Sequence, residues 1–152
     1  MGTRSAIARQ DTITGKISAI YCHWDGYISN NGKILSSYYD EDADVKSLIA
    51  LGDLSSLGSK LNGDETHTFN NANNDTCVAY GRDRGETGVD AREFNDVAEF
   101  VNEMDASGCE YFYLFDGENW FVCEGERDDN GNPVFGFLDV AIAYAEDSKI
   151  YG

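Results

Sequence analysis

The chain has 152 residues, with 28 acidic and 11 basic side chains, and a formal net charge of −17. Hydrophobic residues make up 41 % of it and aromatic residues 12 %, which argues against disorder and is enough for one domain with its own core. No apolar run is long enough to span a bilayer, and the first ten residues lack the apolar segment of a signal peptide. We therefore expect a cytoplasmic protein that does not enter a membrane.

The charge is unevenly distributed. Residues 1–85 carry 11 acids and 8 bases, for a net charge of −3, whereas residues 86–152 carry 17 acids and 3 bases, for −14. Such a chain repels nucleic acid and attracts basic protein surfaces, although the acids also serve solubility alone. Four cysteines occur without C-x-x-C spacing, which favours free buried thiols over disulfides or a zinc site.

The first half of the chain predicts a hairpin followed by two helices. Residues 5–9 and 16–23 are rich in strand-forming side chains and are joined by a short polar turn. A short helix is expected over 31–39. A second helix follows from Asp42 or Asp44 to Gly52, with one buried stripe of residues at helical spacing (Val45, Leu48 and Ile49).

The second half begins with a long polar, Asn-rich loop over 62–76 and a strand over 76–80. An amphipathic helix is expected over 94–104, and a hairpin over 110–123 with its turn at 116–119. Residues 137–147 fit either a strand or a helix, and their alanines favour the helix. These elements predict one compact α+β domain over 1–152, with a mostly antiparallel sheet of about five strands and three to four helices.

Two segments carry the side chains best suited to bind a small ligand. Residues 21–27 (YCHWDGY) place aromatic rings beside an imidazole and a carboxylate, a set that can stack on a planar group and hydrogen-bond its polar edge. The candidates are Tyr21, His23, Trp24, Asp25 and Tyr27. The alternative interpretation is a strand end that enters a turn, with the rings in the core.

The second segment, residues 80–86 (YGRDRGE), places Arg82 and Arg84 between glycines. Guanidinium groups bind phosphate or carboxylate in a bidentate manner, and Arg4 is a third cation that can join such a site. The alternative is internal, with both arginines neutralising neighbouring acids and fastening a loop.

Patterns for catalysis or metal binding are weak. Cys22 and His23 are neighbours on a predicted strand and point to opposite faces, and His67 lies alone in the polar loop. Residues 128–132 (DDNGN) lack the order of an EF-hand loop. We therefore expect no catalytic residue, metal or cofactor.

The chain resembles a group of small bacteriophage and prophage proteins. The resemblance covers about the first ninety residues and rests on Gly2–Ser5 (GTRS), Tyr21–Tyr27, Asn31–Leu35 (NGKIL) with Tyr39, Leu51–Leu57 (LGDLSSL) and Tyr80–Glu86. It implies a phage origin and action in the cytoplasm of a bacterial host, and it suggests a counter-defence role. It transfers no catalytic residue.

Three functions compete. The first is a non-enzymatic counter-defence inhibitor whose acidic surface occupies a basic, nucleic-acid-binding site of a host defence protein, by mimicry of nucleic acid. That surface would comprise Glu93, Asp96, Glu99, Glu103, Asp105, Glu124, Glu126, Asp128 and Asp129. The second is a binder that sequesters a nucleotide-like immune signal through the two segments above. The third is a nucleotide- or sugar-processing enzyme with His23 and Asp25 as acid and base. A homo-oligomer through the aromatic hairpin 111–120 is left open.

Overall fold

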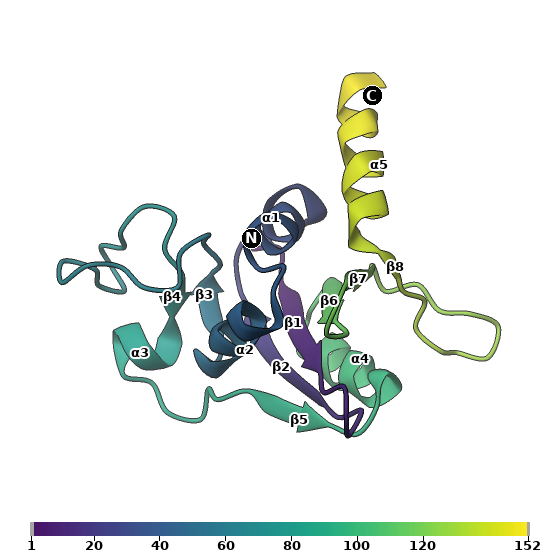
Figure 1. Ribbon diagram of the computed structural model, residues 1–152, viewed down its shortest axis with the longest axis horizontal. Coiled ribbons are helices and arrows are strands. Elements are labelled where there is room, and N and C mark those ends of the chain that lie inside the picture. The colour runs from purple at the N-terminus through teal and green to yellow at the C-terminus, as the bar shows by residue number, and fades with distance from the viewer. Residues whose placement is uncertain (1, 152) are drawn as a thin grey trace.

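The fold is built on one mixed β-sheet, with strands in the order β4-β3-β2-β1-β6-β7-β8 and with β5 paired to β2 (Figure 1). The computed structural model describes the backbone of residues 2–151 and the side chains of residues 2–146. The central strands are the ones that the sequence predicts. β1 (Ser5–Gln10) and β2 (Ile17–Cys22) form the antiparallel hairpin, and β6 (Tyr111–Phe115) and β7 (Trp120–Cys123) form the second.

The two hairpins join through β1 and β6, which run parallel, and β2 and β3 are parallel as well. The sheet is therefore mixed rather than mostly antiparallel. The described chain contains eight strands instead of about five, because four short strands extend its edges: β3 (Leu54–Ser56), β4 (Val78–Ala79), β5 (Arg92–Phe94) and β8 (Gly136–Phe137). Segments of two or three residues are too short to show strand periodicity, so the sequence did not indicate β3, β5 or β8, whereas β4 lies inside the strand expected over 76–80.

Helices cover both faces of the sheet. On one face, α1 (Lys33–Tyr38) and α2 (Asp42–Ala50) bury Leu35, Val45 and Leu48 against β1 and β2. On the other face, α4 (Val97–Ala106) buries Phe100 and Met104 against the same strands. Residues 5–8 of β1 are buried without interruption, as expected of a strand covered on both sides.

Several element boundaries differ from the prediction. The first helix begins with a π-helical turn, η1 (Ile28–Gly32), and residues 80–84, expected as strand end and loop, form helix α3 (Tyr80–Arg84), which ends at Gly85 with a φ of 73°. Phe94 belongs to β5, and α4 starts after Asp96, whose carboxylate accepts the Glu99 N–H at 2.8 Å. The described residues thus contain five α-helices and η1, rather than three to four helices.

The C-terminal segment is helical, as its alanines favoured. Helix α5 (Leu138–Tyr151) begins directly after β8 and then stands out from the body of the molecule (Figure 1). Its first turns are held on the domain by Leu138, which is buried near Gly32, by a hydrogen bond from Ser36 to Asp139, and by an ion pair between Lys33 and Glu146.

Two further expectations are confirmed. All four cysteines are free and buried. Residues 62–75 contain no helix and no strand, as expected for the polar loop, and the bridge between Lys60 and Thr76 closes its base. None of the helices in residues 2–151 is long and apolar enough to cross a membrane.

Candidate functional site

The predicted ligand segment, residues 21–27, does not form one site: its ring-bearing residues up to Trp24 lie in one cluster and the residues after Trp24 lie elsewhere. Tyr21 and His23 lie on one face of the end of β2 and its continuation, with the Tyr21 hydroxyl 2.8 Å from His23 Nδ1. The indole of Trp24 meets the His23 ring edge-on at 4.7 Å between centroids and is 44 % exposed. The backbone of Gly2 packs against the same indole, so these rings form a partly open cluster at the N-terminal end of the chain.

Arg4 belongs to this cluster. Burial raises the pKa of Tyr21, and the positive charge of Arg4 opposes that rise, which places the guanidinium within electrostatic reach of the phenol. Gly108 leaves the space for it, because a Cβ there would stand 2.9 Å from Arg4 Nη1. Within the described residues, the Arg4 side chain is exposed and forms no hydrogen bond or ion pair.

Asp25 and Tyr27 are tied by their backbone carbonyls to η1. Asp25 has a φ of 55°, in the left-handed region, and its carbonyl accepts hydrogen bonds from Asn31 N–H and the Asn30 side chain. Its carboxylate lines a different, polar hollow of about 480 Å³ beside the 72–76 segment. Tyr27 is 40 % exposed and directly precedes η1. The structure therefore brings Arg4, Tyr21, His23 and Trp24 together, without Asp25 and Tyr27.

Arg82 is occupied by internal acceptors. Its guanidinium donates to the carboxylate of Asp83 at 2.9 Å and to the carbonyls of Leu61 at 2.6 Å and Cys77 at 2.8 Å. Asp83 also accepts from the N–H of Ala79 and lies 3.1 Å from His67 Nε2. Burial alone would raise the pKa of Asp83, but these hydrogen bonds lower it to about 2. Arg82 thus fastens both ends of the polar loop to α3.

Arg84 is fastened as well. Its guanidinium lies over the rings of Phe69 and Tyr80, at 4.8 Å and 5.2 Å from their centroids, and it pairs with Glu86 at 2.8 Å. Asp53 links the two ligand segments, because its carboxylate accepts the N–H of Tyr21 and its backbone carbonyl accepts the N–H of Tyr80. The arginines of residues 80–86 do not join Arg4 in one anion site.

The acidic residues of the second half gather on α4 and on the loop between β7 and β8. Arg127 in that loop donates to Asn102 of α4 at 2.9 Å, and Asn132 and Pro133 border the start of α4, so the two segments form one surface. Three of the predicted acids have structural roles in it. Glu93 pairs with Lys16, Asp96 caps α4, and Asp128 accepts the N–H groups of Asn130 and Asn132.

The remaining six acids make few or no side-chain hydrogen bonds or ion pairs within the described residues. Glu99 accepts one hydrogen bond, from Asn95. Within the described residues, no side-chain hydrogen bond or ion pair is made by five exposed acids of this surface: Glu103, Asp105, Glu124, Glu126 and Asp129. We call these five the free acids. Arg127 is the single basic residue between positions 93 and 146 of the sequence.

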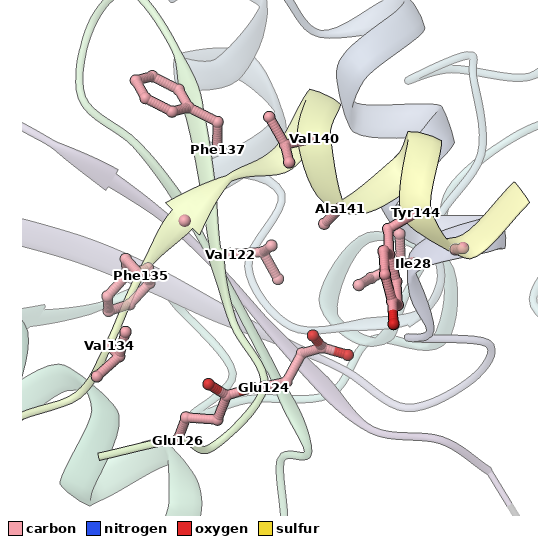
Figure 2. A pocket seen from close by; sticks show the side chains of 12 residues that line it. Ile28, Val122, Glu124, Glu126, Val134, Phe135, Phe137, Val140, Ala141 and Tyr144 are labelled. Carbon is pink, nitrogen blue, oxygen red and sulfur yellow. The ribbon is translucent and has the colours of Figure 1, made fainter. Parts of the chain in front are cut away.

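Two of the free acids, Glu124 and Glu126, border an apolar groove of about 520 Å³ between α5 and the β7–β8 segment. Figure 2 shows Val140 and Tyr144 on α5, Val134 and Phe135 on the approach to β8, and Val122 on β7. In this view Glu126 lies on the side away from α5, whereas the carboxylate of Glu124 extends toward the hydroxyl end of Tyr144; among the described residues that line the groove, these two are the only charged ones. We call this hollow the α5 groove.

Sequence reasoning missed the α5 groove. Val140 and Tyr144 are four residues apart, share one helix face and are 67 % and 74 % exposed, while Phe137 and Val134 are 54 % and 43 % exposed. The signal in the sequence was a helix with apolar residues on nearly all of its faces. Such a helix has more apolar surface than a single contact with the sheet can bury. Because residues 137–147 fit either a strand or a helix, the sequence did not indicate this exposed helix face.

Comparison with known protein families, curated proteins and solved structures gave no match. A search of the described residues for three or more His, Cys, Asp or Glu side chains able to hold one metal ion found no such group. The candidate site is therefore the acidic surface of α4 and the 124–134 loop, together with the α5 groove at its border.

Proposed function

We propose that this protein is a non-enzymatic, phage-encoded inhibitor that acts in the host cytoplasm by binding a basic, nucleic-acid-binding site of a host defence protein. The observation that carries the proposal is the set of five free acids on α4 and on the loop between β7 and β8. Carboxylates accept charge-assisted hydrogen bonds from Arg and Lys, as phosphates do, so such a surface can replace nucleic acid in a basic groove.

The electrostatics support the same proposal. A net charge of −14 over residues 86–152 produces a field that steers a basic partner toward this surface before contact. Exposed like charges repel one another and destabilise the folded state slightly, and a basic partner removes that repulsion on binding. Asp96 and Asp128 add negative charge while serving the local fold, so the field is supported even by the structural acids.

The first test is identification of a partner. The tagged protein is purified gently from a bacterial host that carries defence systems and is examined by native mass spectrometry. We expect an added mass of protein size. A bare mass from hosts in which the protein blocks defence, or an added mass of nucleotide size, would contradict an inhibitor that acts by holding a protein.

The second test addresses the surface. Five neutralising changes, Glu103→Gln, Asp105→Asn, Glu124→Gln, Glu126→Gln and Asp129→Asn, remove the free acids. Each exposed pair contributes about 0.2–1 kcal/mol, so for five pairs we expect at least about a fivefold loss of affinity at low salt and a shallower salt dependence.

The matched control removes the same charge from exposed, unpaired acids elsewhere: Asp40→Asn, Glu41→Gln, Asp44→Asn, Glu65→Gln and Asp90→Asn. The control should keep most of the affinity. Equal losses in the two variants would mean that only net charge matters, and binding that is unchanged between low and high salt would exclude the acidic surface.

A second candidate function is a binder of a nucleotide-like signal at Arg4, Tyr21, His23 and Trp24. The observation in its favour is that, among the described residues, the Arg4 side chain makes no ion pair, although the chain is strongly acidic and the Arg4 charge acts on Tyr21 in the cluster with the exposed Trp24 indole. A nucleotide that binds there raises the melting temperature, because it binds only the native state. This reading requires the shift to vanish in Arg4→Ala and to persist in Lys60→Ala, a cation of the polar loop.

A further inference from the structure

The α5 groove combines exposed apolar walls with a one-signed rim. Three of the large hydrophobic residues exposed on this protein, Val134, Val140 and Tyr144, line it, while the ring of Phe137 packs on Phe121. Exposed apolar side chains gathered in one hollow are typical of a binding surface, whereas isolated ones are ordinary. Both rim carboxylates, Glu124 and Glu126, lack a partner within the described residues.

From this juxtaposition we propose that the α5 groove receives an amphipathic segment of the partner protein, in which large apolar side chains enter the groove and neighbouring Lys or Arg residues pair with Glu124 and Glu126. This inference rests on the proposed function and adds the chemistry of the partner. It requires the partner to present an apolar anchor beside its basic residues, not a basic surface alone.

Charge complementarity selects this occupant over a second copy of the chain. A two-fold dimer would place the same groove of each copy in one interface, so Glu124 and Glu126 of both copies would lose water without gaining a cation. Each copy also carries a net charge of −17. A segment with Lys or Arg next to its apolar residues meets both requirements of the groove.

The acidic surface and the apolar walls of the α5 groove contribute to binding in different ways. Glu103, Asp105 and Asp129 attract a basic surface at long range, but exposed pairs contribute little and are screened by salt. The apolar walls contribute on contact and do so at any salt concentration. Burial of one large side chain of the partner is expected to tighten binding by about tenfold or more.

Three synthetic peptides test the proposal by fluorescence anisotropy at low and high salt. The first carries Lys and Leu at helical spacing, the second has Ser in place of each Leu, and the third has Gln in place of each Lys. We expect the Lys/Leu peptide to bind at least tenfold more tightly than the Lys/Ser peptide, and to keep most of that advantage at high salt. The third peptide, which carries Leu and Gln, lacks the cations that pair with Glu124 and Glu126, so we expect it to bind weakly.

Variants of each wall locate the binding. Val140→Ser with Tyr144→Ser changes α5, and Val134→Ser changes the opposite wall without touching that helix; all three side chains are at least 43 % exposed, so the fold does not depend on them. Each variant should abolish the advantage of the Lys/Leu peptide and leave Lys/Ser binding unchanged. Ile13→Ser, which is 92 % exposed in the β1–β2 turn, is the control and should change neither.

The outcomes separate this inference from the proposed function. If both Lys peptides bind equally and binding depends on the free acids, the acidic surface stands and the groove proposal is overturned. If neither Lys peptide binds, both are overturned. Tight binding of the Leu/Gln peptide, or a protein dimer that disappears in the groove variants, would overturn the basic occupant in favour of an apolar segment or a second copy.

Discussion

The carboxylate of Asp53 accepts the backbone N–H of Tyr21 at 2.9 Å, at the point where β2 changes its partner from β5 to β3. Strand pairing leaves the Tyr21 N–H without a backbone acceptor there, and Asp53 accepts it instead through its carboxylate. Its own N–H binds the Val89 carbonyl, and its carbonyl accepts from Tyr80 N–H. One buried residue thus holds both ligand segments in place, through its side chain at Tyr21 and through its backbone at Tyr80.

Substitution of Asp53 should separate its hydrogen-bonding role from its charge. Asp53→Ala leaves the Tyr21 N–H without an acceptor and should lower the free energy of unfolding by about 1–3 kcal/mol. Asp53→Asn keeps the acceptor oxygen and loses only a 3.5 Å contact with the half-exposed Arg92, so it should lie within about 1 kcal/mol of wild type. Urea denaturation measures both, and equal losses would contradict the hydrogen-bonding role.

The same pair of proteins gives a pH test. Burial raises the pKa of Asp53, with the Tyr21 N–H and Arg92 opposing the rise. A raised carboxyl pKa favours the protonated folded state, so its contribution is full below the unfolded value of about 3.9 and is lost as pH rises through the folded value. The stability of wild type relative to Asp53→Asn should therefore fall as pH is raised from 3.5 to 7. A difference that grows over that range would have the wrong sign.

Asp83 should behave in the opposite way. Burial opposes ionisation, but hydrogen bonds led by Arg82 lower its pKa to about 2. Its contribution is therefore full above the unfolded value of about 3.9 and is lost as pH falls toward 2. Arg82→Met should destabilise the protein at pH 7, and the difference from wild type should shrink on acidification.

The readout for Arg82→Met includes amide exchange in residues 61–77, because Arg82 holds the Leu61 and Cys77 carbonyls at the base of the loop. Faster exchange confined to this segment is expected. Unchanged exchange there, with loss of ligand or partner binding instead, would return Arg82 to a binding role.

The core of the fold could be predicted from sequence because its signals are periodic. Val45, Leu48 and Ile49 follow one helix face, and both hairpins join runs of strand formers through turn residues, so these elements were expected in their correct places. Their order in the sheet could not be predicted. The parallel contact of β1 with β6 joins residues more than a hundred positions apart, which no local pattern records.

The site was predictable in composition but not in geometry. Acidity pointed to the second half of the chain, but tertiary contacts such as the Arg127–Asn102 hydrogen bond, which no local pattern records, join the 124–134 loop to α4. Arg82 and Arg84 carry the chemistry of an anion site, and their partners Asp83 and Phe69 decide that they fasten a loop. The α5 groove escaped notice because an exposed apolar helix face and a buried one have the same sequence pattern.

The cysteines should be inert in the native protein. Burial raises the pKa of Cys22 and of Cys109 to about 12, and that of Cys77 and Cys123 in the same direction, so almost no thiolate forms at pH 8. A thiol reagent such as dithionitrobenzoate should react with four thiols in guanidinium and with essentially none in native buffer. A fast-reacting thiol in the folded protein would contradict the burial of that residue.

Arg84 offers the sharpest distinction between loop fastening and ligand binding. Its guanidinium lies over Phe69 and Tyr80, an arrangement worth about 0.5–1 kcal/mol at an exposed site, so Arg84→Ala should lower the free energy of unfolding by that amount. Arg84→Lys keeps the charge but loses the planar stack, and it should recover less than half of the loss. If both variants keep wild-type partner binding, Arg84 only secures the loop. If Arg84→Ala leaves stability unchanged but abolishes binding, the stack is incidental and the residue belongs to a site for an anionic ligand.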